Sequence, residues 1–216
     1  RIWEEIPLLR YFFNTSKLTV LITILQLLTS TFAAYAFAKM KFPGKDFLFL
    51  SYICTIAMPW QSYMIPQFII IKKMGLVNTH LALIILQSFT AFGVFLVRQF
   101  YMEIPNEICE AARIDGMSEY GIYAKIMLPL SKPVIATLTI FSFTTIWNDF
   151  MGPLIYINSQ NLKTIQLGLR SFITEYSSEY SLIMAGSVVA LIPVLIVFAC
   201  LQKYFVEGIA STGLKG

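Results

Sequence analysis

Residues 18–38 read LTVLITILQLLTSTFAAYAFA, an apolar run with no charged residue between Lys17 and Lys39. A helix needs about 20 predominantly apolar residues to cross a membrane, because the hydrocarbon core is about 30 Å thick and each residue adds about 1.5 Å. The run is also longer than the apolar segment of a secretory signal. It therefore predicts a transmembrane helix.

Four further runs of similar length follow along the chain. They cover residues 47–71, 74–97, 133–157 and 180–202, and only the run at 133–157 contains a charged residue, Asp149. Together with the first run they predict five spans, and we expect a sixth span upstream of the sequence. The predicted fold class is all-α, a polytopic transmembrane helix bundle, because helices satisfy their own backbone hydrogen bonds in lipid.

The composition supports this fold class. Hydrophobic residues make up 57% of the 216 residues and charged residues 13%, whereas a soluble protein has about 25% charged residues. The mean hydropathy is +0.70. These values exclude a disordered chain, a coiled coil and a nucleic-acid binder, and they leave too few polar side chains to cover a soluble globule. The net charge of +4 is too small to indicate an anionic partner.

The chain offers few residues for catalysis or metal binding. Cys54, Cys109 and Cys200 lie far apart without a CxxC pair, and His80 is the single histidine. A metal site or a disulfide framework needs closer sets or an even count. The segment GIASTGLK at 208–215 is nearest to a phosphate-binding loop, but its second glycine and its lysine are not adjacent. We therefore expect no catalytic, metal or cofactor site in this chain.

Prolines and small residues interrupt the apolar runs. A proline removes a helical hydrogen bond, and a broken helix is either a packing feature or the wall of a cavity. Small residues at four-residue intervals predict close contact between helices. The prolines are Pro59, Pro66, Pro153 and Pro193, and the small residues are Ser30, Ala34 and Ala38 in the first run and Gly186 and Ala190 in the fifth.

Trp147, Asn148 and Asp149 form the most polar point inside a predicted span. An Asp at the centre of a spanning helix costs about 2.5–3.5 kcal/mol on insertion scales, so it is expected to face water or a partner. Trp can stack on sugar rings, and Asn and Asp can bind hydroxyl groups. The three residues are therefore candidates for lining a substrate pathway. The alternative is an interfacial Trp beside an Asp that lies in a loop.

The segment at 98–132, between the third and fourth runs, carries much of the charge of the chain. Asn106 is a candidate N-cap for a short helix, and Gly116 can end that helix because glycine tolerates a left-handed conformation. Ser118 can cap a second helix. Both helices are too short to be stable alone in water, so we expect the loop to dock on the bundle or on another protein.

The sequence EAARIDG in this loop resembles the EAA motif of membrane subunits of binding-protein-dependent ABC importers. Other segments resemble the carbohydrate-importer branch, the maltose and glycerol-phosphate type: AYAFAKMKFPG, IPQF, WNDFMGPL, AGSVVALIPVL and the terminal VEGIASTGLKG. The resemblance covers residues 14–216, and the family's first span is missing from it. The residues that match the motif are Glu110, Ala111, Ala112, Asp115 and Gly116, followed by Ile126, Leu128 and Pro129.

The resemblance implies that residues 110–116 form a coupling helix and turn that sit in a groove of an ATPase subunit. Gly116 would permit the bend, and Glu110 or Asp115 would accept hydrogen bonds from the ATPase. Leu128 and Pro129 would complete the ATPase-coupling set. The distribution of basic residues leaves the orientation open, whereas the resemblance places the loop in the cytoplasm.

The resemblance also implies an organisation of the chain and its surroundings. An external segment at 1–17 would precede a transmembrane domain at 18–205 that contains the coupling loop at 98–132. The tail at 206–216 and the C-terminus would be cytoplasmic. The protein would be a multi-pass component of the bacterial or archaeal plasma (inner) membrane, surrounded by membrane lipid.

The resemblance implies a transport subunit and not an enzyme. Two ATPase subunits would bind ATP, and a second permease subunit would complete a pathway that works by alternating access. An extracytoplasmic substrate-binding protein would deliver a sugar or a related small solute near residues 158–179. The alternatives are an importer permease for a polyamine, peptide or ion, and an ATP-independent carrier or channel. A polytopic membrane enzyme would need clustered ionisable residues, whereas Asp149 stands nearly alone.

Overall fold

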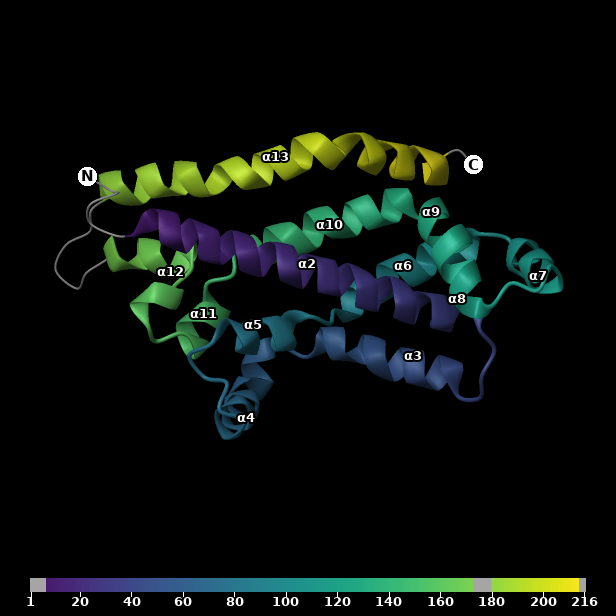
Figure 1. The fold of residues 1–216 in the computed structure, drawn as a ribbon, viewed down its shortest axis with the longest axis horizontal. Helices are drawn as coiled ribbons and strands as arrows, with labels where there is room; N and C mark the ends of the chain where they lie inside the picture. Colours follow the sequence, from purple (N-terminus) through teal and green to yellow (C-terminus); the bar gives the residue numbers. More distant parts are fainter. Residues whose placement is uncertain (1–6, 173–179, 214–216) are drawn as a thin grey trace. The chain divides into compact units, whose positions relative to one another are not determined.

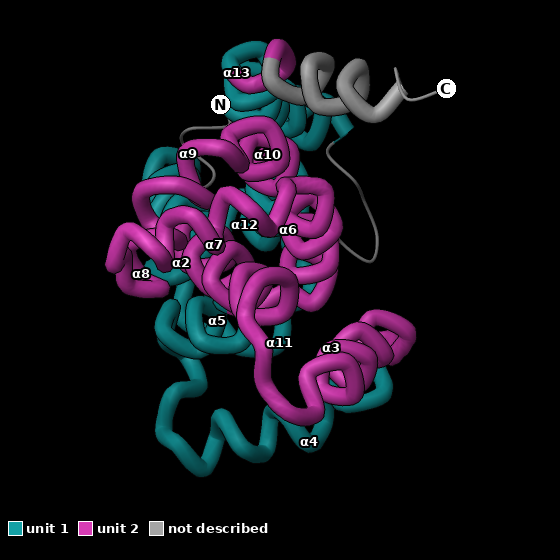
Figure 2. The backbone as a smooth tube through the Cα atoms, turned by 90° about the vertical axis from the view of Figure 1, so that its right-hand side faces the viewer, with its two compact units in different colours: residues 1–23, 61–88, 141–200 teal, residues 24–60, 89–140, 201–216 magenta. Residues whose placement is uncertain are grey.

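The computed structural model describes residues 7–172 and 180–213, with side chains as far as residue 203. All regular elements in these residues are helices, from α2 (Leu8–Lys39) to α13 (Tyr180–Gly213) (Figure 1). The predicted all-α fold class is confirmed. The chain divides into two compact units (Figure 2). Unit 1 comprises residues 1–23, 61–88 and 141–200, and unit 2 comprises residues 24–60, 89–140 and 201–216.

Several of the described helices are long and apolar enough to cross a membrane. Three segments qualify singly: Leu8–Lys39, His80–Glu103, which contains a break at residues 88–90, and Tyr180–Lys203. Glu119–Leu130 and Lys132–Trp147 qualify only as a pair that is bent by 79°. The exact limits of the five predicted spans, and the sides assigned to the two ends of the chain, stay predictions. Parts of three predicted features lie outside the described residues. They are residues 1–6 of the external segment, 173–179 of the binding-protein contact and 214–216 of the tail.

The second apolar run is divided into three helical pieces. They are α3 (Lys45–Cys54), the 3-10 turn η1 (Thr55–Ala57) and α4 (Trp60–Lys73). The break lies at Met58, whose ψ of 113° is extended. This conformation is expected before Pro59, because the proline ring disfavours a helical residue directly ahead of it. Pro66 in α4 and Pro193 in α13 lie inside their helices without ending them.

The third apolar run forms two helices, α5 (His80–Gln87) and α6 (Ala91–Glu103). Each begins after a threonine whose hydroxyl accepts a hydrogen bond from the backbone N–H three residues later. Thr79 accepts from Ala82 at 3.3 Å, and Thr90 accepts from Gly93 at 3.4 Å. These bonds satisfy N–H groups that the first turn of a helix leaves without a helical partner. The two caps therefore stabilise helix starts at residues 80 and 91, within the apolar run.

Unit 1 contains the start of α2, most of α4 and α13, all of α5, and α11 (Met151–Tyr156) and α12 (Ile165–Leu169). Polar contacts hold the irregular segment between α11 and α12. His80 Nε2 pairs with the carbonyl of Leu162 at 2.8 Å, and the N–H of Ile165 donates to Thr15 Oγ1 at 2.9 Å. The core of the unit consists of Leu8, Tyr11, Ile165, Leu169, Phe172, Leu182 and Ala190.

Unit 2 contains the end of α2, α3, α6, the loop helices and the first part of α10 (Lys132–Trp147). Helices α2 and α6 meet closely, because a Cβ atom on Gly93 would lie 2.5 Å from Ser30 Oγ. Ser30 and Ala34 are both 0% exposed, which confirms the predicted close helix contact at small residues. The core consists of Ala34, Tyr35, Val97, Tyr101, Cys109, Ala112, Ile122, Met127, Val134 and Leu138.

The loop of unit 2 consists of α7 (Asn106–Ile114), α8 (Glu119–Ile122), η2 (Tyr123–Met127) and α9 (Leu128–Leu130). The prediction of two short helices joined at Gly116 is confirmed. Element η2 is a π-helical turn, in which the N–H of Leu128 donates to the carbonyl of Tyr123. Pro129 gives a physical reason, because its ring would clash with the carbonyl of Lys125, four residues earlier, in a regular helix. The wider turn relieves that clash.

Candidate functional site

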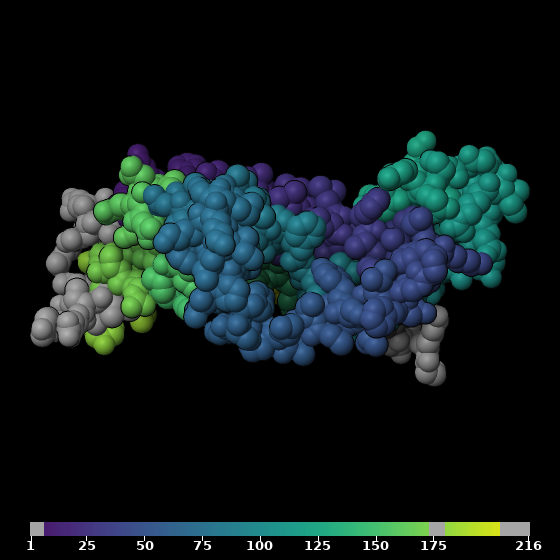
Figure 3. All heavy atoms as spheres, turned by 90° about the horizontal axis from the view of Figure 1, so that it is seen from below, coloured from purple at the N-terminus to yellow at the C-terminus, as the bar shows by residue number. Residues whose placement is uncertain are grey.

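Helix α7 divides its residues between the core and the surface. Cys109 and Ala112 are 1% and 6% exposed and belong to the unit 2 core. Glu110 and Ala111 lie on the exposed side. Ile114 is 86% exposed, which is unusual for a large apolar side chain. Figure 3 shows the loop as a teal lobe that projects beyond the purple and blue atoms of α2 and α3, so a partner can reach its outer side.

The turn that follows α7 is built around Gly116. This glycine has a φ of 79°, in the left-handed region, and its N–H donates to the carbonyl of Arg113 at 3.0 Å. The N–H of Met117 donates to the carbonyl of Ala112 at 2.9 Å. The two bonds form the Schellman arrangement that ends many helices. Ser118 then caps α8 by accepting a hydrogen bond from the N–H of Gly121 at 3.2 Å, so both predicted roles are confirmed.

The start of α7 differs from the prediction. Asn106 is the first helical residue and not the N-cap, a position that Pro105 takes without a side-chain hydrogen bond. The Asn106 side chain instead accepts a hydrogen bond from Lys39 Nζ at 2.8 Å. Lys39 Nζ also donates to the carbonyl of Ile104 at 2.5 Å. The last residue of α2 therefore binds acceptor groups at the start of α7, and the N-cap position has no side-chain hydrogen bond.

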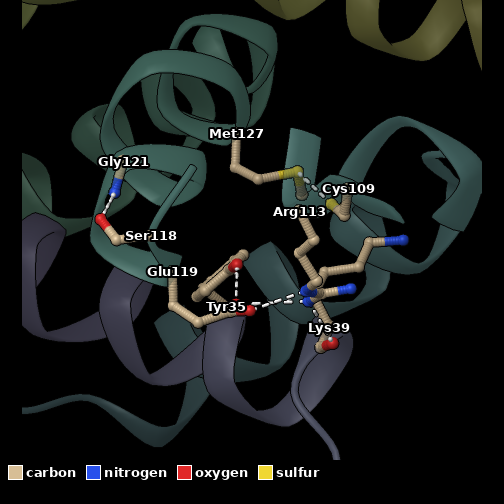
Figure 4. A network of polar contacts seen from close by, with 8 residues as sticks. All are labelled: Tyr35, Lys39, Cys109, Arg113, Ser118, Glu119, Gly121 and Met127. Carbon is tan, nitrogen blue, oxygen red and sulfur yellow. Dashed lines mark hydrogen bonds and ion pairs between the residues drawn. The ribbon is translucent and has the colours of Figure 1, made fainter. Parts of the chain in front are cut away.

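A polar network at Glu119 joins three helices (Figure 4). Arg113 from α7 donates to both carboxylate oxygens of Glu119, through Nε at 2.7 Å and Nη2 at 3.2 Å. The Tyr35 hydroxyl from α2 donates to the same carboxylate at 2.5 Å. Arg113 Nη2 also donates to the carbonyl of Lys39 at 3.3 Å. Arg113, and then Tyr35, hold the pKa of Glu119 below its ordinary value by hydrogen bonding to the charged carboxylate.

The apolar runs and the loop motif give no indication of the network formed by Tyr35, Lys39, Arg113 and Glu119. Lys39 ends an apolar run and Tyr35 lies inside it, so hydropathy alone gives neither residue a partner. Arg113 and Glu119 lie on two different helices across the Gly116 turn, so no helical spacing relates them. The available signal was local: two opposite charges close to a turn.

The other residues of the ATPase-coupling set lie around the same loop. Asp115 and Gly116 are exposed in the turn, and Pro129 is exposed in α9. Leu128 is half-buried and provides the N–H that closes the π-helical turn. The structure thus brings the set together on one loop, while the role of each residue in coupling stays a prediction.

The cysteines are separated from one another in the described part of the chain. No group of three His, Cys, Asp or Glu side chains there could hold a metal ion. Cys54 and Cys200 are exposed. Burial raises the pKa of the Cys109 thiol, so it stays neutral and donates to Met127 Sδ at 3.8 Å. Its position is that of a small packing residue of the unit 2 core.

Trp147, the first substrate-pathway candidate, lies inside unit 1. It is 1% exposed, and its indole N–H donates to the carbonyl of Ala190 at 2.8 Å. Its ring stacks on Phe143, with the centroids 5.6 Å apart, and meets Phe12 edge to face at 5.5 Å. In this conformation the Trp147 ring is covered by protein atoms.

Asn148 and Asp149, the other two candidates, point to different partners. Asn148 is exposed, and its side-chain oxygen accepts a hydrogen bond from Gln166 at 3.2 Å. Asp149 accepts from Gln87 Nε2 at 2.7 Å and from the N–H of Gly152 at 3.1 Å. The cavity beside Asp149 measures about 10 Å³, which is room for about one water molecule. A role in the substrate pathway stays a prediction for all three residues.

Comparisons with known proteins agree with these features. Residues 12–211 match the family model described as binding-protein-dependent transport system inner membrane component. The chain is 37% identical to the arabinooligosaccharides transport system permease protein AraQ of Halalkalibacterium halodurans, over 95% of this chain and 74% of that protein. It is 33% identical to the lactose transport system permease protein LacG of Rhizobium radiobacter, over 96% and 76%.

A solved structure gives the same result for the fold. It is the crystal structure of a bacterial ABC transporter involved in the import of the acidic polysaccharide alginate, and one of its chains aligns with a TM-score of 0.81 and 26% identity. The alignment covers 91% of this chain and 74% of that chain. The exposed EAARIDG helix, the apolar helices and the match over residues 12–211 lead to one conclusion. The chain belongs to the family of inner membrane components of binding-protein-dependent transport systems, the permease subunits of ABC importers.

Proposed function

We propose that this chain is the permease subunit of an importer for an oligosaccharide, driven by ATP that separate partner subunits bind and hydrolyse. The main support is the exposed α7 helix that carries EAARIDG, in a chain whose relatives are permeases for arabinooligosaccharides and lactose. Trp147, Asn148 and Asp149 are the candidates for the substrate pathway, because their side chains suit sugar rings and hydroxyl groups.

The docking face for the ATPase consists of Glu110, Ala111 and Ile114 on the outer side of α7. Ile114, at 86% exposed, would fill an apolar pocket in the partner. Ala111 is small and exposed, so it lets the partner surface approach the helix closely. Glu110 would accept hydrogen bonds from basic residues at the rim of that pocket. The expected partner surface is therefore a groove with an apolar floor and a basic edge.

The stoichiometry and the orientation follow from this docking. A second permease subunit would present its own loop, so two ATPase subunits would bind one permease pair. ATP is cytoplasmic, which would place the loop of unit 2 in the cytoplasm. The segment from α10 to α11 and then α13 would cross the membrane twice more, which returns the C-terminus to the cytoplasmic side of the plasma (inner) membrane. A substrate-binding protein would contact the external side near residues 158–172.

Alternating access would then couple ATP hydrolysis to import. Closure of the two ATPase subunits would displace α7 and shift the bundle between inward-facing and outward-facing states. The ATPase must bind these two states with different affinity, because equal binding shifts no equilibrium. The small cavity at Asp149 is consistent with a conformation in which that part of the pathway is closed.

Uptake into proteoliposomes tests the proposed function. The chain is reconstituted with its permease partner, ATPase and binding protein, and radiolabelled arabinotriose and lactose are offered outside with ATP available to the ATPase. We expect accumulation that stops with an ATPase variant unable to hydrolyse ATP. Accumulation that continues with this variant would support an ATP-independent carrier. Uptake of a polyamine or a peptide in place of either sugar would overturn the carbohydrate assignment.

Retention of the ATPase tests the docking face. We expect Ile114→Ala to weaken ATPase binding about 30-fold, as truncation of an interface anchor costs about 2 kcal/mol. The matched control is Ile65→Ala on α4, the same truncation at a residue that is 65% exposed. Co-purification of equal amounts of ATPase with both variants would contradict the assignment.

A further inference from the structure

Helix α7 is attached to the end of α2 at two points. At its start, Lys39 Nζ donates to the carbonyl of Ile104 and to the side chain of Asn106. At its end, Arg113 donates to the carbonyl of Lys39 and to Glu119. These bonds join residues that are 65 to 74 positions apart in the sequence, apart from the local pair across the turn. The chain itself connects α7 only to α6 and α8, so these contacts add a second connection.

The hydrogen bonds at Glu119 fix the orientation of α7 relative to α2. The planar guanidinium of Arg113 donates to both carboxylate oxygens, and such paired bonds hold the relative orientation of the two groups. The carboxylate in turn accepts the hydroxyl proton of Tyr35, which is 2% exposed. A small rotation of α7 about its axis would lengthen one of these bonds. The network therefore ties the orientation of α7 to α2.

The Arg113–Glu119 ion pair is partly exposed, so it can orient α7 while it contributes little to folding stability. The side chains of Arg113 and Glu119 are 36% and 38% exposed. Ion pairs with this exposure contribute little to folding stability, because water screens the charges. The apolar contacts of Cys109 and Ala112 remain when the pair is removed, so α7 would stay folded on the unit 2 core.

We propose that Arg113, Glu119 and Tyr35 are positioning residues that make α2 move together with α7 when the ATPase closes. The inference rests on the proposed function, since it takes α7 as the docking helix. The displacement of α7 then enters the bundle through three helices, α6, α2 and α10, and not only through the two that flank the loop in sequence. Without the network, α7 can rotate about its axis relative to α2, and α2 no longer follows the displacement of α7.

A distance measurement in the complete transporter tests this inference. Spin labels are placed by a non-canonical amino acid on the exposed residues Leu28 of α2 and Ile108 of α7, which lie outside the network and the docking face. The label-to-label distance is measured in nanodiscs without nucleotide and after trapping with ATP and vanadate. In the native network we expect one narrow distance that changes by less than about 2 Å, a shift smaller than one helical turn.

Substitutions then remove the network. We expect Arg113→Gln and Glu119→Gln each to broaden the distance distribution or shift it on trapping, and Tyr35→Phe to do so more weakly. The double variant should resemble the single ones, because two residues that act as a pair are not additive. The controls are Lys125→Gln and Glu103→Gln, which neutralise exposed charges outside the network. A native, narrow distance in both states of Arg113→Gln and Glu119→Gln would overturn the inference.

ATP hydrolysis provides the second readout. We expect the two network variants to retain the ATPase within twofold of the native amount while the ATP consumed per arabinotriose or lactose imported rises at least threefold. Equal consumption in native and variant complexes would also overturn the inference. Failure of the proposed function looks different, because the native chain would then not retain the ATPase at all.

Discussion

The loop at 98–132 and the Trp147–Asp149 segment are both polar segments of an apolar chain. They differ in whether their side chains are exposed or bound to other residues of the same unit. On α7, Glu110 and Ile114 are exposed, and the polar contacts that hold the helix come from residues at its two ends. In unit 1, Trp147 and Asp149 direct their polar atoms to other residues of the same unit. Polar residues in an apolar chain can therefore lie exposed on one helix or join helices within one unit.

In unit 1, Asp149 connects the break between α10 and α11 to a neighbouring helix. Helix α10 ends at Trp147 and α11 begins at Met151, and Asp149 lies in the break between them. Its carboxylate accepts from the N–H of Gly152 in the first turn of α11, where helices favour a negative charge. Gln87 of α5 donates to the other oxygen. Asp149 therefore fixes the break to a neighbouring helix, whether or not it also meets a solute.

Trp147→Ala should have the largest effect of the changes that compare the two regions. It removes a ring that is 1% exposed and its bond to Ala190, and a buried Trp truncated to Ala costs about 3–5 kcal/mol. We expect a clear fall in the thermal unfolding midpoint of the detergent-purified protein. Glu110→Ala on the exposed side of α7 should change it little, since surface substitutions stay within about 0.5 kcal/mol. Equal midpoints for the two variants would remove the distinction between joint and surface.

Asp149→Leu should have an intermediate effect. It leaves Gln87 Nε2 and the N–H of Gly152 without this acceptor, a loss of about 1–3 kcal/mol. We expect uptake to fall several-fold while the amount of assembled transporter in the membrane is retained. Asp149→Asn keeps one acceptor oxygen, so it should stay within twofold of native. If Asn reduces uptake as much as Leu without lowering stability, the charge acts on the solute and the pathway assignment gains support.

Gly116→Ala should have a smaller effect, confined to the coupling loop. Its φ of 79° disfavours any residue with a Cβ, at a cost of about 1–2 kcal/mol, although no atom lies within 4 Å of the added methyl group. We expect ATPase binding to weaken a few-fold. Gly44→Ala is the matched control, because Gly44 has a φ of 75° and equally open space in the turn before α3. If both variants weaken binding equally, the effect is general strain and not the geometry of the docking helix.

The smallest effect is the response of the Arg113–Glu119 pair to pH. The pKa of Glu119 is lowered from 4.5 by its hydrogen bonds, so its contribution to stability is fully present above that value and disappears as the pH falls through the folded-state pKa. We expect the difference in unfolding midpoint between native protein and Glu119→Gln to be constant from about pH 8 to about pH 5. Partial exposure keeps this difference small. A difference that disappears near pH 7 would contradict the assignment of the lowered pKa.

The sequence predicts the parts of this fold that depend on local physics. Uninterrupted apolar runs predict α2 and α13, and the roles of Gly116 and Ser118 follow from single-residue conformational and capping preferences. The same reasoning could have found Thr79 and Thr90, but an average over an apolar window hides a single capping hydroxyl. Hydropathy therefore gives the presence of a span more reliably than its start.

Other features depend on contacts between distant parts of the chain. The Asn106 side chain, expected to cap α7, instead accepts a hydrogen bond from Lys39, because folding brings the end of α2 to the start of α7. The burial of Trp147 depends on α13, whose Ala190 carbonyl accepts its hydrogen bond. A single sequence contains no periodicity that relates such pairs. The motif residues could be identified, but the two helices that hold them in place could not.

The π-helical turn at residues 123–127 requires a fixed number of residues in this part of the loop. A π turn holds one more residue than an α turn, and each residue turns a helix by about 100°. Deleting one residue there would restore an ordinary α turn, because the wider turn is what accommodates the extra residue. The clash at Pro129 would return at the same time. The loop should therefore tolerate changes of residue type at this turn far better than a single-residue deletion.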